Sequence, residues 1–400
     1  MSEYSVGTGE VLAFLPERRR TDQSIARLVS SSAMVQSDVR VAALYAALSS
    51  HEELQAVGVV DPEGQIVGII VRRDFMATMA KPYAQDVFRN HPISEVMSSA
   101  RTFSGDTNVF SVSEEIAEEM RQPTVRYYLL TWSGNRFAGI FSSQDMLVYL
   151  SGITQSDIAM ATNLQSRIVR DRYIAVGERL ELIAFNQTAK GVGGDFYNVT
   201  QYAPGHWLIA LCDVSGKGVA ASVITSVLWG MMSIFDFREG IAAFVKVVNR
   251  YLVQTFEAER FVTAVIMDYD ESTGRVDLCD LGHSHLFLAR GGALKAVKTN
   301  QNNLPLGIMA DVEPVVDTVR PHPSDVMLLT TDGLMEQANL SGEEYGIERA
   351  ARVFADHGSQ PVEIISDRLA QDFNQFRGKH PLGDDVTWTV MRFAPQEVVL

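Results

Sequence analysis

Short apolar runs separated by tight turns fill the first 150 residues of the chain. Two segments each contain a strand, a turn, a second strand and the start of a helix. In the first segment these lie at residues 55–60, 61–64, 65–71 and from Arg72, and in the second at 127–132, 133–135, 136–141 and from Ser142. The two segments are offset by about 71 residues, which indicates an internal duplication.

The spacing of apolar residues becomes helical after residue 150. Ile158, Ala161, Leu164 and Ile168 recur at near-helical intervals, with polar residues between them. This pattern predicts an amphipathic helix that joins two domains, and an ordinary packing helix is the alternative. We therefore expect a loose leader at 1–20, a first domain at 21–150, a linker helix at 151–172 and a second domain at 173–400.

The second domain has the pattern of an α+β fold. Strands are expected at 181–185, 207–212, 261–268, 276–281, 286–289, 294–297, 326–329 and 386–391. Helices are expected at 218–235, 241–256, 347–356 and 362–376. Hairpins combined with paired helices predict two antiparallel sheets with helices on their outer faces.

Composition and charge exclude several classes of protein. The 46% hydrophobic and 21% charged content is that of a globular chain. A formal net charge of −15 argues against nucleic acid as the main partner. No apolar run reaches the roughly 18 residues of a membrane span, so we expect a cytoplasmic protein. Cys212 and Cys279 lie in apolar runs without metal-ligand spacing, which predicts a buried, reduced pair.

Four glycine–aspartate segments stand at the ends of strand-like runs. They are GVGGDFY at 191–197, DVSGKG at 213–218, TTDG at 330–333 and GDDVT at 383–387. Two carboxylates about 4 Å apart repel by roughly 4 kcal/mol at an effective dielectric of 20. Divalent cations relieve such repulsion, and carboxylate oxygens suit magnesium or manganese. The sequence therefore predicts a two-metal site.

These motifs resemble, in order, those of metal-dependent Ser/Thr phosphatases of the protein phosphatase 2C (PPM) type. The branch is the bacterial one typified by SpoIIE and RsbU. The resemblance covers about residues 160–395 and includes RFVTA at 260–264, Gly282-His283 and LPLG at 304–307. It implies an α-β-β-α sandwich, two Mn²⁺ or Mg²⁺ ions per site, and hydrolysis of a phosphoserine or phosphothreonine by hydroxide attack on phosphorus.

The resemblance also implies roles for individual residues. Asp213 would bridge the two metals, with the backbone carbonyl of Val214 as a further ligand. Asp195 would hold one metal, partly through waters. Asn198 stands where this branch often has an aspartate. The glycines beside these aspartates would let the backbone approach the cations and take positive φ; they are Gly193, Gly194, Gly216 and Gly333.

Asp332 and Asp384 would complete the other metal. Asp384 is preferred because it lies three residues before the threonine of GDDVT, and Asp385 is the alternative. Lys217 could attract phosphate or be a solvated lysine. His283 could donate a proton to the leaving oxygen or only cap a turn.

The duplicated N-terminal segment resembles a pair of CBS domains. In that family a glycine, a hydroxyl residue three positions on and an aspartate six positions on hold the ribose and phosphate of an adenine nucleotide. Gly139, Ser142 and Asp145 match this pattern. The resemblance therefore implies an adenine nucleotide as a ligand of the N-terminal domain.

The first repeat departs from the pattern. Gly68 and Asp74 match, but Val71 stands in place of the hydroxyl residue. Two readings that need no nucleotide stay open: a scaffold that only dimerises, and aspartates that cap helices.

Together these features favour a cytoplasmic Ser/Thr phosphoprotein phosphatase with an N-terminal CBS-pair sensor, acting as a homodimer. The resemblance implies a STAS-domain anti-sigma-factor antagonist as substrate in a partner-switching circuit. The first alternative is a catalytically silent, adenine-nucleotide-sensing scaffold that binds phosphoproteins. The second is a metal-dependent hydrolase of small phosphoesters. No nucleic acid or membrane is expected as a partner.

Overall fold

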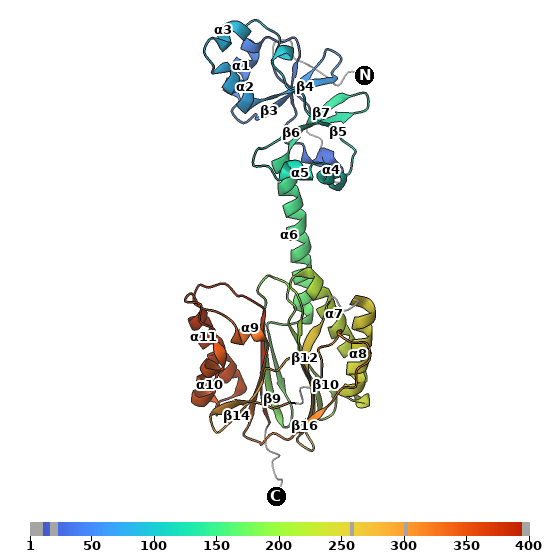
Figure 1. Ribbon diagram of the computed structural model, residues 1–400, viewed down its shortest axis with the longest axis vertical. Coiled ribbons are helices and arrows are strands. Elements are labelled where there is room, and N and C mark those ends of the chain that lie inside the picture. The colour runs from blue at the N-terminus through green and yellow to red at the C-terminus, as the bar shows by residue number, and fades with distance from the viewer. Residues whose placement is uncertain (1–10, 17–22, 257–259, 300–302, 394–400) are drawn as a thin grey trace. The chain divides into compact units, whose positions relative to one another are not determined.

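The computed structural model describes residues 11–16, 23–256, 260–299 and 303–393 (Figure 1). The chain divides into two compact units, Met1–Gln155 and Ser156–Leu400. Most of the leader predicted at 1–20 lies outside the described residues. Within it, the short strand β1 (Ala13–Phe14) pairs with β2 (Ala33–Gln36).

Two small sheets with a repeated arrangement form the first unit. Their strands are β1 and β2, then β3 (Ala56–Val60), β4 (Ile66–Val71), β5 (Thr102–Ser104), β6 (Tyr127–Trp132) and β7 (Arg136–Ser142). The sheet orders are β1-β2-β3-β4 and β5-β6-β7. In both, a parallel pair is followed by an antiparallel hairpin: β2–β3–β4 and β5–β6–β7. This repeated topology is what an internal duplication predicts.

The helices of this unit lie between or after the strands. They are α1 (Val41–Ser50), α2 (Arg72–Met79), α3 (Ala84–Phe88), α4 (Val109–Glu115) and α5 (Ala117–Met120), with 3₁₀ helices at Ile25–Leu28 and Ile93–Glu95. The two halves share a buried cluster in which Met34 and Ile69 of the first half lie with Leu129, Phe137 and Ile140 of the second. The strands predicted at 55–60, 65–71, 127–132 and 136–141 are present within a residue of those bounds.

The linker helix predicted at 151–172 is part of a longer helix. Helix α6 runs from Ser143 to Ile168, and the boundary between the two units falls within it. The predicted bounds are therefore wrong at both ends. No proline interrupts this stretch, so the helix that opens after Ser142 continues. Arg172 already belongs to a strand, β8 (Arg172–Val176).

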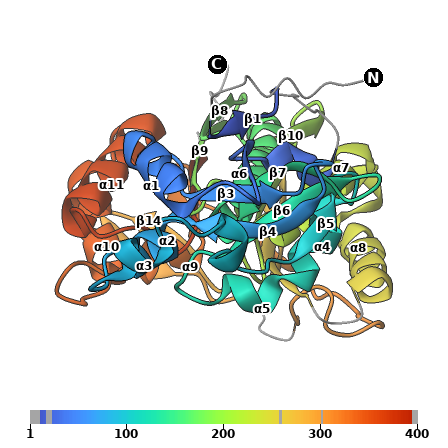
Figure 2. The same ribbon diagram turned by 90° about the horizontal axis from the view of Figure 1, so that it is seen from above.

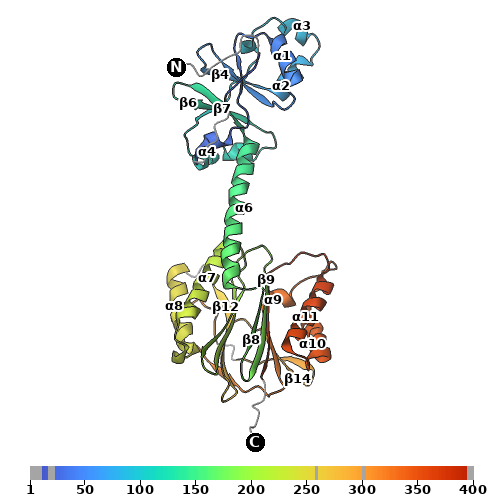
Figure 3. The same cartoon turned by 180° about the vertical axis from the view of Figure 1, so that it is seen from behind.

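Two antiparallel sheets packed face to face form the second unit (Figures 1 and 3). One has the order β10-β11-β12-β13-β16 and the other β15-β14-β17-β18-β9-β8. The remaining strands are β9 (Leu180–Gln187), β10 (Phe196–Ala203), β11 (His206–Val214), β12 (Val262–Asp270), β13 (Arg275–Leu281), β14 (Leu286–Arg290), β15 (Ala293–Ala296), β16 (Asp317–Val319), β17 (Val326–Thr330) and β18 (Val386–Phe393).

Helices cover the outer face of each sheet. They are α7 (Val219–Ile234), α8 (Ile241–Phe256), α9 (Asp332–Met335), α10 (Gly346–His357) and α11 (Val362–Arg377), with a 3₁₀ helix at Phe237–Glu239. Helices α7 and α8 pack on the five-stranded sheet, and α10 and α11 pack on the six-stranded sheet (Figures 1 and 2). The predicted α-β-β-α sandwich is confirmed for this unit. Strands β8, β10 and β16 were not predicted.

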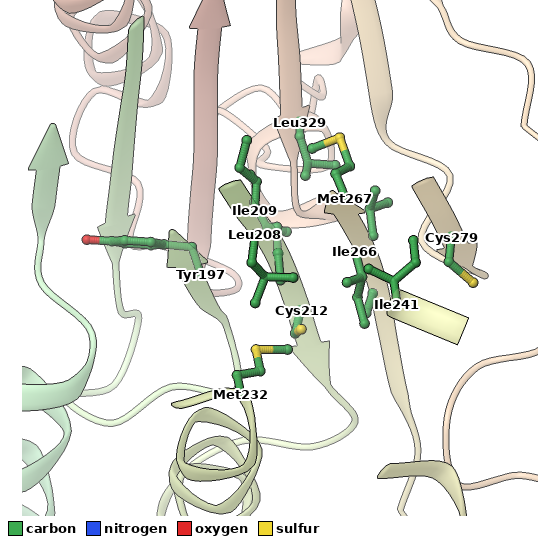
Figure 4. Packing of buried hydrophobic residues seen from close by; sticks show 14 of the residues in the cluster. Tyr197, Leu208, Ile209, Cys212, Met232, Ile241, Ile266, Met267, Cys279 and Leu329 are labelled. Atoms are coloured by element: carbon green, nitrogen blue, oxygen red, sulfur yellow. The ribbon is translucent and has the colours of Figure 1, made fainter. Parts of the chain in front are cut away.

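Alternating side chains of the six-stranded sheet fill two separate cores. Leu182 and Leu329 face the other sheet, whereas Ile183 and Leu328 face α10 and α11. Figure 4 shows part of the first core, in which Met267 of β12 and Leu329 of β17 come from different sheets. Both faces of this sheet are therefore buried, which holds its strand ends in place.

The structure bears on two expectations that came from the composition, one about the cysteines and one about membrane-spanning helices. Cys212 and Cys279 are buried and free, as predicted. Among the described helices, none combines the length and apolar character needed to cross a membrane.

Trp388 supplies a stability test of the second core. It is fully buried on β18, its ring stacks on Phe185 at 4.0 Å, and its indole N–H donates to Ser366 Oγ at 2.9 Å. We expect Trp388→Ala to lower the free energy of unfolding by about 3–5 kcal/mol, because it leaves a large cavity. Urea unfolding measures this. Leu340→Ala, at a side chain that is 76% exposed, is the control and should change stability by less than about 0.5 kcal/mol; equal effects would contradict the packing.

Candidate metal centre

Asp195 and Asp213 lie next to each other on the five-stranded sheet. Asp195 directly precedes β10, and Asp213 is near the end of β11. Phe196 pairs with Cys212 in the antiparallel register, which sets the two aspartates at the same end of neighbouring strands. The predicted pair is therefore brought together by ordinary strand pairing.

Asp332 and Asp384 reach the same region from the six-stranded sheet. Asp332 opens α9 just after β17, and Asp384 lies two residues before β18. The N–H of Thr331 donates to the carbonyl of Thr387 at 2.9 Å, which joins these two strand ends. Carboxylates from both sheets thus meet at one end of the sandwich.

Asp195 is the most deeply buried member of this group. Its side chain belongs to a residue that is 3% exposed, and its Oδ2 accepts a hydrogen bond from Thr331 Oγ1 at 2.7 Å. The negative charge of Asp213, at the end of the neighbouring strand, acts directly on the Asp195 carboxylate. One carboxylate therefore links the two sheets through polar contacts.

The electrostatics are those of crowded negative charge. Burial, followed by the charges of Asp332, Asp384 and Asp385, raises the pKa of Asp213 to about 7. Burial and the neighbouring Asp213 raise the pKa of Asp195 well above its ordinary value. Both shifts mean that the fold holds these groups where a full set of negative charges is unfavourable.

The two aspartates of the GDD motif have different surroundings. Asp385 is buried, and its carboxylate accepts the backbone N–H groups of Ala189 and Gly194, both at 2.8 Å. Burial raises its pKa. Asp384 has a side chain that is 42% exposed, and its Oδ2 lies 2.8 Å from Lys217 Nζ. Asp385 therefore organises the 189–194 loop, whereas Asp384 faces the group of carboxylates.

Two glycines bring the motifs into contact. A Cβ atom on Gly194 would lie 2.7 Å from the carbonyl oxygen of Val214, and one on Gly333 would collide with the carbonyl oxygen of Asp385. Neither glycine has positive φ, whereas Gly216 does, at +94°. Close approach is therefore the requirement at 194 and 333, and backbone conformation is the requirement at 216.

Lys217 and His283 are both engaged with protein atoms. Lys217 Nζ pairs with Asp384 and also donates to the carbonyl of Gly383 at 2.8 Å. His283 is buried, with Nε2 at 2.8 Å from the carbonyl of Thr330 and Nδ1 at 3.1 Å from Thr263 Oγ1. Burial lowers its pKa to about 4. A neutral imidazole with both nitrogens in hydrogen bonds is unsuited to proton donation. We therefore favour a structural role for His283.

Gln165 is a site neighbour that the sequence motifs did not indicate. It lies near the end of α6, is 6% exposed, donates from Nε2 to the carbonyl of Gly193 at 2.7 Å and accepts the N–H of Gly193 at 2.9 Å. In the sequence, Gln165 differs from other polar residues of the helix only in lying between apolar neighbours, which does not indicate a role at the site. The end of α6 is therefore hydrogen-bonded to the loop that carries Asp195.

The donors gathered here are oxygen atoms of the kind that Mg²⁺ and Mn²⁺ prefer. In the described part of the chain, no three carboxylate, imidazole or thiol groups already stand in an arrangement that could hold a metal ion. The raised pKa of Asp213 nevertheless shows that the cluster would gain from positive charge. The chemistry of the residues fits a divalent cation.

Comparison with known proteins bears on most of the second unit. Residues 203–394 match the family model described as Stage II sporulation protein E (SpoIIE). The SiaA-PP2C domain of Pseudomonas aeruginosa superposes with a TM-score of 0.52 at 20% identity, covering 61% of this chain and 98% of that domain. The second unit therefore carries a SpoIIE-type PP2C phosphatase domain.

Curated relatives share this phosphatase domain at low identity. Phosphoserine phosphatase RsbP of Bacillus subtilis (strain 168) is 20% identical over 238 residues, 58% of this chain and 56% of RsbP. Stage II sporulation protein E of Priestia megaterium is 27% identical over 154 residues, 37% of this chain and 26% of that protein. The matches thus span about half or less of these relatives' own lengths.

The residues predicted to bind a nucleotide lie outside the phosphatase domain and form a helix cap. Ser142 N and Oγ both donate to Asp145 Oδ2 at 2.7 Å, and Asp145 N donates to Ser142 Oγ at 3.1 Å. This is a reciprocal capping box at the start of α6. Ser30 Oγ also donates to Asp145 Oδ2 at 2.7 Å. Gly139 has φ of +143° and packs against Val29.

The first repeat has no such cap. The side chain of Val71 makes no capping hydrogen bond at the start of α2, and Asp74 pairs with Arg73 at 2.9 Å on the surface. The departure at Val71 therefore changes the local structure, as the missing hydroxyl predicts.

The crowded carboxylates of the phosphatase domain predict a pH dependence of stability without metal. The folded protein holds the Asp213 proton up to about pH 7, whereas the unfolded chain releases it near 3.8. Unfolding therefore releases a proton between these values, and stability falls as pH rises through them. As the pH rises, we expect the free energy of unfolding of wild type to fall relative to that of Asp213→Asn. The upper bound of this fall is about 1.4 kcal/mol for each unit by which the pKa of Asp213 is raised.

Urea unfolding in a chelator, near pH 5 and near pH 8, measures this difference. Asp356→Asn, at an exposed position of α10, is the matched control. A difference between wild type and Asp213→Asn that stays constant with pH would contradict the electrostatic argument.

Proposed function

We propose that the chain is a metal-dependent Ser/Thr phosphoprotein phosphatase. The observation that carries the proposal is the meeting of Asp195 with Asp213, Asp332 and Asp384 from two sheets, the last three within the residues that match the SpoIIE family model. A cluster of partly buried carboxylates needs positive charge, and the substrate phosphate is itself anionic. Divalent cations would neutralise the carboxylates and also attract the phosphate.

The residues divide into ligands and residues that hold the ligands. Asp213, Asp332, Asp384 and Asp195 would hold two Mn²⁺ or Mg²⁺ ions, with Asp213 serving both, Asp332 and Asp384 serving one and Asp195 serving the other. The carbonyl of Val214 is a further ligand, supported by its place against Gly194. We favour Asp384 over Asp385 as the ligand, because Asp385 is buried and its carboxylate already accepts two backbone N–H groups of the 189–194 loop.

When bound, the two ions would lower the pKa of water and neutralise charge on the phosphoryl oxygens. The chain's own contribution is orientation. Thr331 fixes the carboxylate of Asp195, and the Lys217–Asp384 pair holds the 213–218 and 383–387 loops together. His283 keeps its nitrogens in buried hydrogen bonds, so we assign it no proton transfer.

The proposed substrate is a protein carrying phosphoserine or phosphothreonine. Support comes from the relative RsbP, which is a phosphoserine phosphatase. We further propose a STAS-domain anti-sigma-factor antagonist in a partner-switching circuit of the cytoplasm.

The first unit is proposed to regulate the phosphatase domain as a CBS-pair sensor of an adenine nucleotide. Its repeated β-strand topology supports a CBS pair. The sensor would act through α6, whose residue Gln165 holds Gly193. Apolar side chains exposed along α6, among them Val148, Met160 and Leu164, support a homodimer.

The first test is hydrolysis of para-nitrophenyl phosphate with and without Mn²⁺. We expect Mn²⁺-dependent turnover by wild type and at least about 100-fold less by Asp213→Ala, because a ligand matters more than the outer groups that orient it. Asp356→Ala, which removes an exposed carboxylate of α10, should leave turnover unchanged. No turnover by folded protein with bound Mn²⁺ would favour the silent scaffold instead.

Gln165 provides a test of the regulatory route. Gln165→Leu removes both hydrogen bonds to Gly193, and we expect the Mn²⁺ concentration for half-maximal turnover to rise about 10-fold. Gln155→Leu makes the same change at an exposed position of α6 and serves as the control. If the two variants show the same Mn²⁺ dependence as wild type, α6 does not act through this contact.

A further inference from the structure

We propose that Gln337 is a positioning residue that fixes the segment carrying Asp384 to the segment that follows Asp332. Gln337 lies two residues after α9, the short helix that opens with Asp332, and it is 3% exposed. Asp384 lies in the irregular segment between α11 and β18. The inference rests on the proposed function, because it concerns two aspartates that would serve the same metal ion.

The side-chain amide of Gln337 makes three hydrogen bonds to backbone groups. Its Oε1 accepts the N–H of Gly383 at 3.1 Å, and its Nε2 donates to the carbonyl of Pro381 at 3.2 Å and to that of Ala338 at 2.8 Å. Since a carbonyl can only accept and an N–H can only donate, these partners allow one orientation of the amide. One planar group therefore makes both bonds to the 381–383 segment.

These bonds act on the backbone immediately before Asp384. Pro381 and Gly383 are two residues apart, so the amide of Gln337 restrains the chain between them. The side chain of Asp384 is 42% exposed, and its carboxylate pairs with Lys217 rather than packing in the core. The place of this carboxylate therefore depends on the backbone that carries it. Groups that orient a metal ligand commonly change metal affinity 10- to 100-fold.

A purely structural role for Gln337 is the competing explanation, because buried backbone groups need partners. Asn249 on α8 offers a matched control. It is 1% exposed, its Oδ1 accepts the N–H of Gly307 at 2.9 Å, and its Nδ2 donates to the carbonyls of Met309 and Ala310 at 2.6 and 3.2 Å. The contacts are of the same kind, but the loop that they hold carries none of the proposed metal ligands.

The experiment measures Mn²⁺ binding to the full, chelator-treated chain by calorimetry and by the electron paramagnetic resonance signal of free Mn²⁺. We expect Gln337→Met to weaken one bound Mn²⁺ about 10-fold or more, and Asn249→Leu to leave Mn²⁺ binding within about twofold of wild type. The melting temperature without metal should fall for both variants, because each leaves buried backbone groups without partners. Equal Mn²⁺ binding by wild type and Gln337→Met, or equal weakening by both variants, would overturn the inference.

A second variant covers the case in which Gln337→Met does not fold. Gln337→Asn keeps a buried amide but ends one methylene short of Pro381 and Gly383, so we expect Mn²⁺ affinity to fall about 10-fold here as well. Wild-type affinity in a folded Gln337→Asn protein would overturn the inference while leaving the proposed function intact. Wild-type protein that binds no Mn²⁺ would overturn the proposed function together with the inference, so the two failures are distinguishable.

Discussion

Repulsion among carboxylates at the common end of two packed sheets is the constraint on which the phosphatase domain depends. The sheets are held along most of their length by apolar side chains, but this end is polar. There, Thr331 donates to Asp195, two backbone N–H groups donate to Asp385, and Lys217 pairs with Asp384. These contacts offset the repulsion only in part, since the pKa of Asp213 stays raised. A positive ion bound at this end of the sandwich would therefore stabilise the fold.

Much of this architecture was predictable because the signals are local. The predicted strands, and the helices of the second unit, follow hydrophobic spacing within a few residues, whereas α6 begins well before the predicted linker helix. The aspartates could be predicted because each stands at the end of an apolar run or before one. Three strands of the second unit were not predicted, because their residues carry no clear strand pattern. Strand β10 begins inside a glycine–aspartate motif, β8 directly follows α6, and β16 is three residues long, so tertiary pairing rather than pattern defines them.

The residues that hold the ligands could not be predicted in the same way. Gln165 is separated from Gly193 by 28 positions and Thr331 from Asp195 by 136, so no local pattern connects them. The choice between Asp384 and Asp385 rested on family likeness, and only the fold shows that Asp385 is occupied by backbone N–H groups. In the first unit, the Ser142–Asp145 pattern has a sufficient explanation as a helix cap. The roles of these residues depend on side-chain contacts between positions far apart in the sequence, which local motifs do not reveal.

The glycines at 194 and 333 limit which mutations this protein can accept. At each, a carbonyl oxygen from another motif occupies the space that any other amino acid would need. A side chain at either position would displace the backbone of another motif, so we expect both positions to accept only glycine. By contrast, Leu304, Met309 and Glu313, which line a cavity of about 170 Å³, are exposed. Substitution of exposed side chains usually changes stability little, so sequence variation is better tolerated at these positions than at the two glycines.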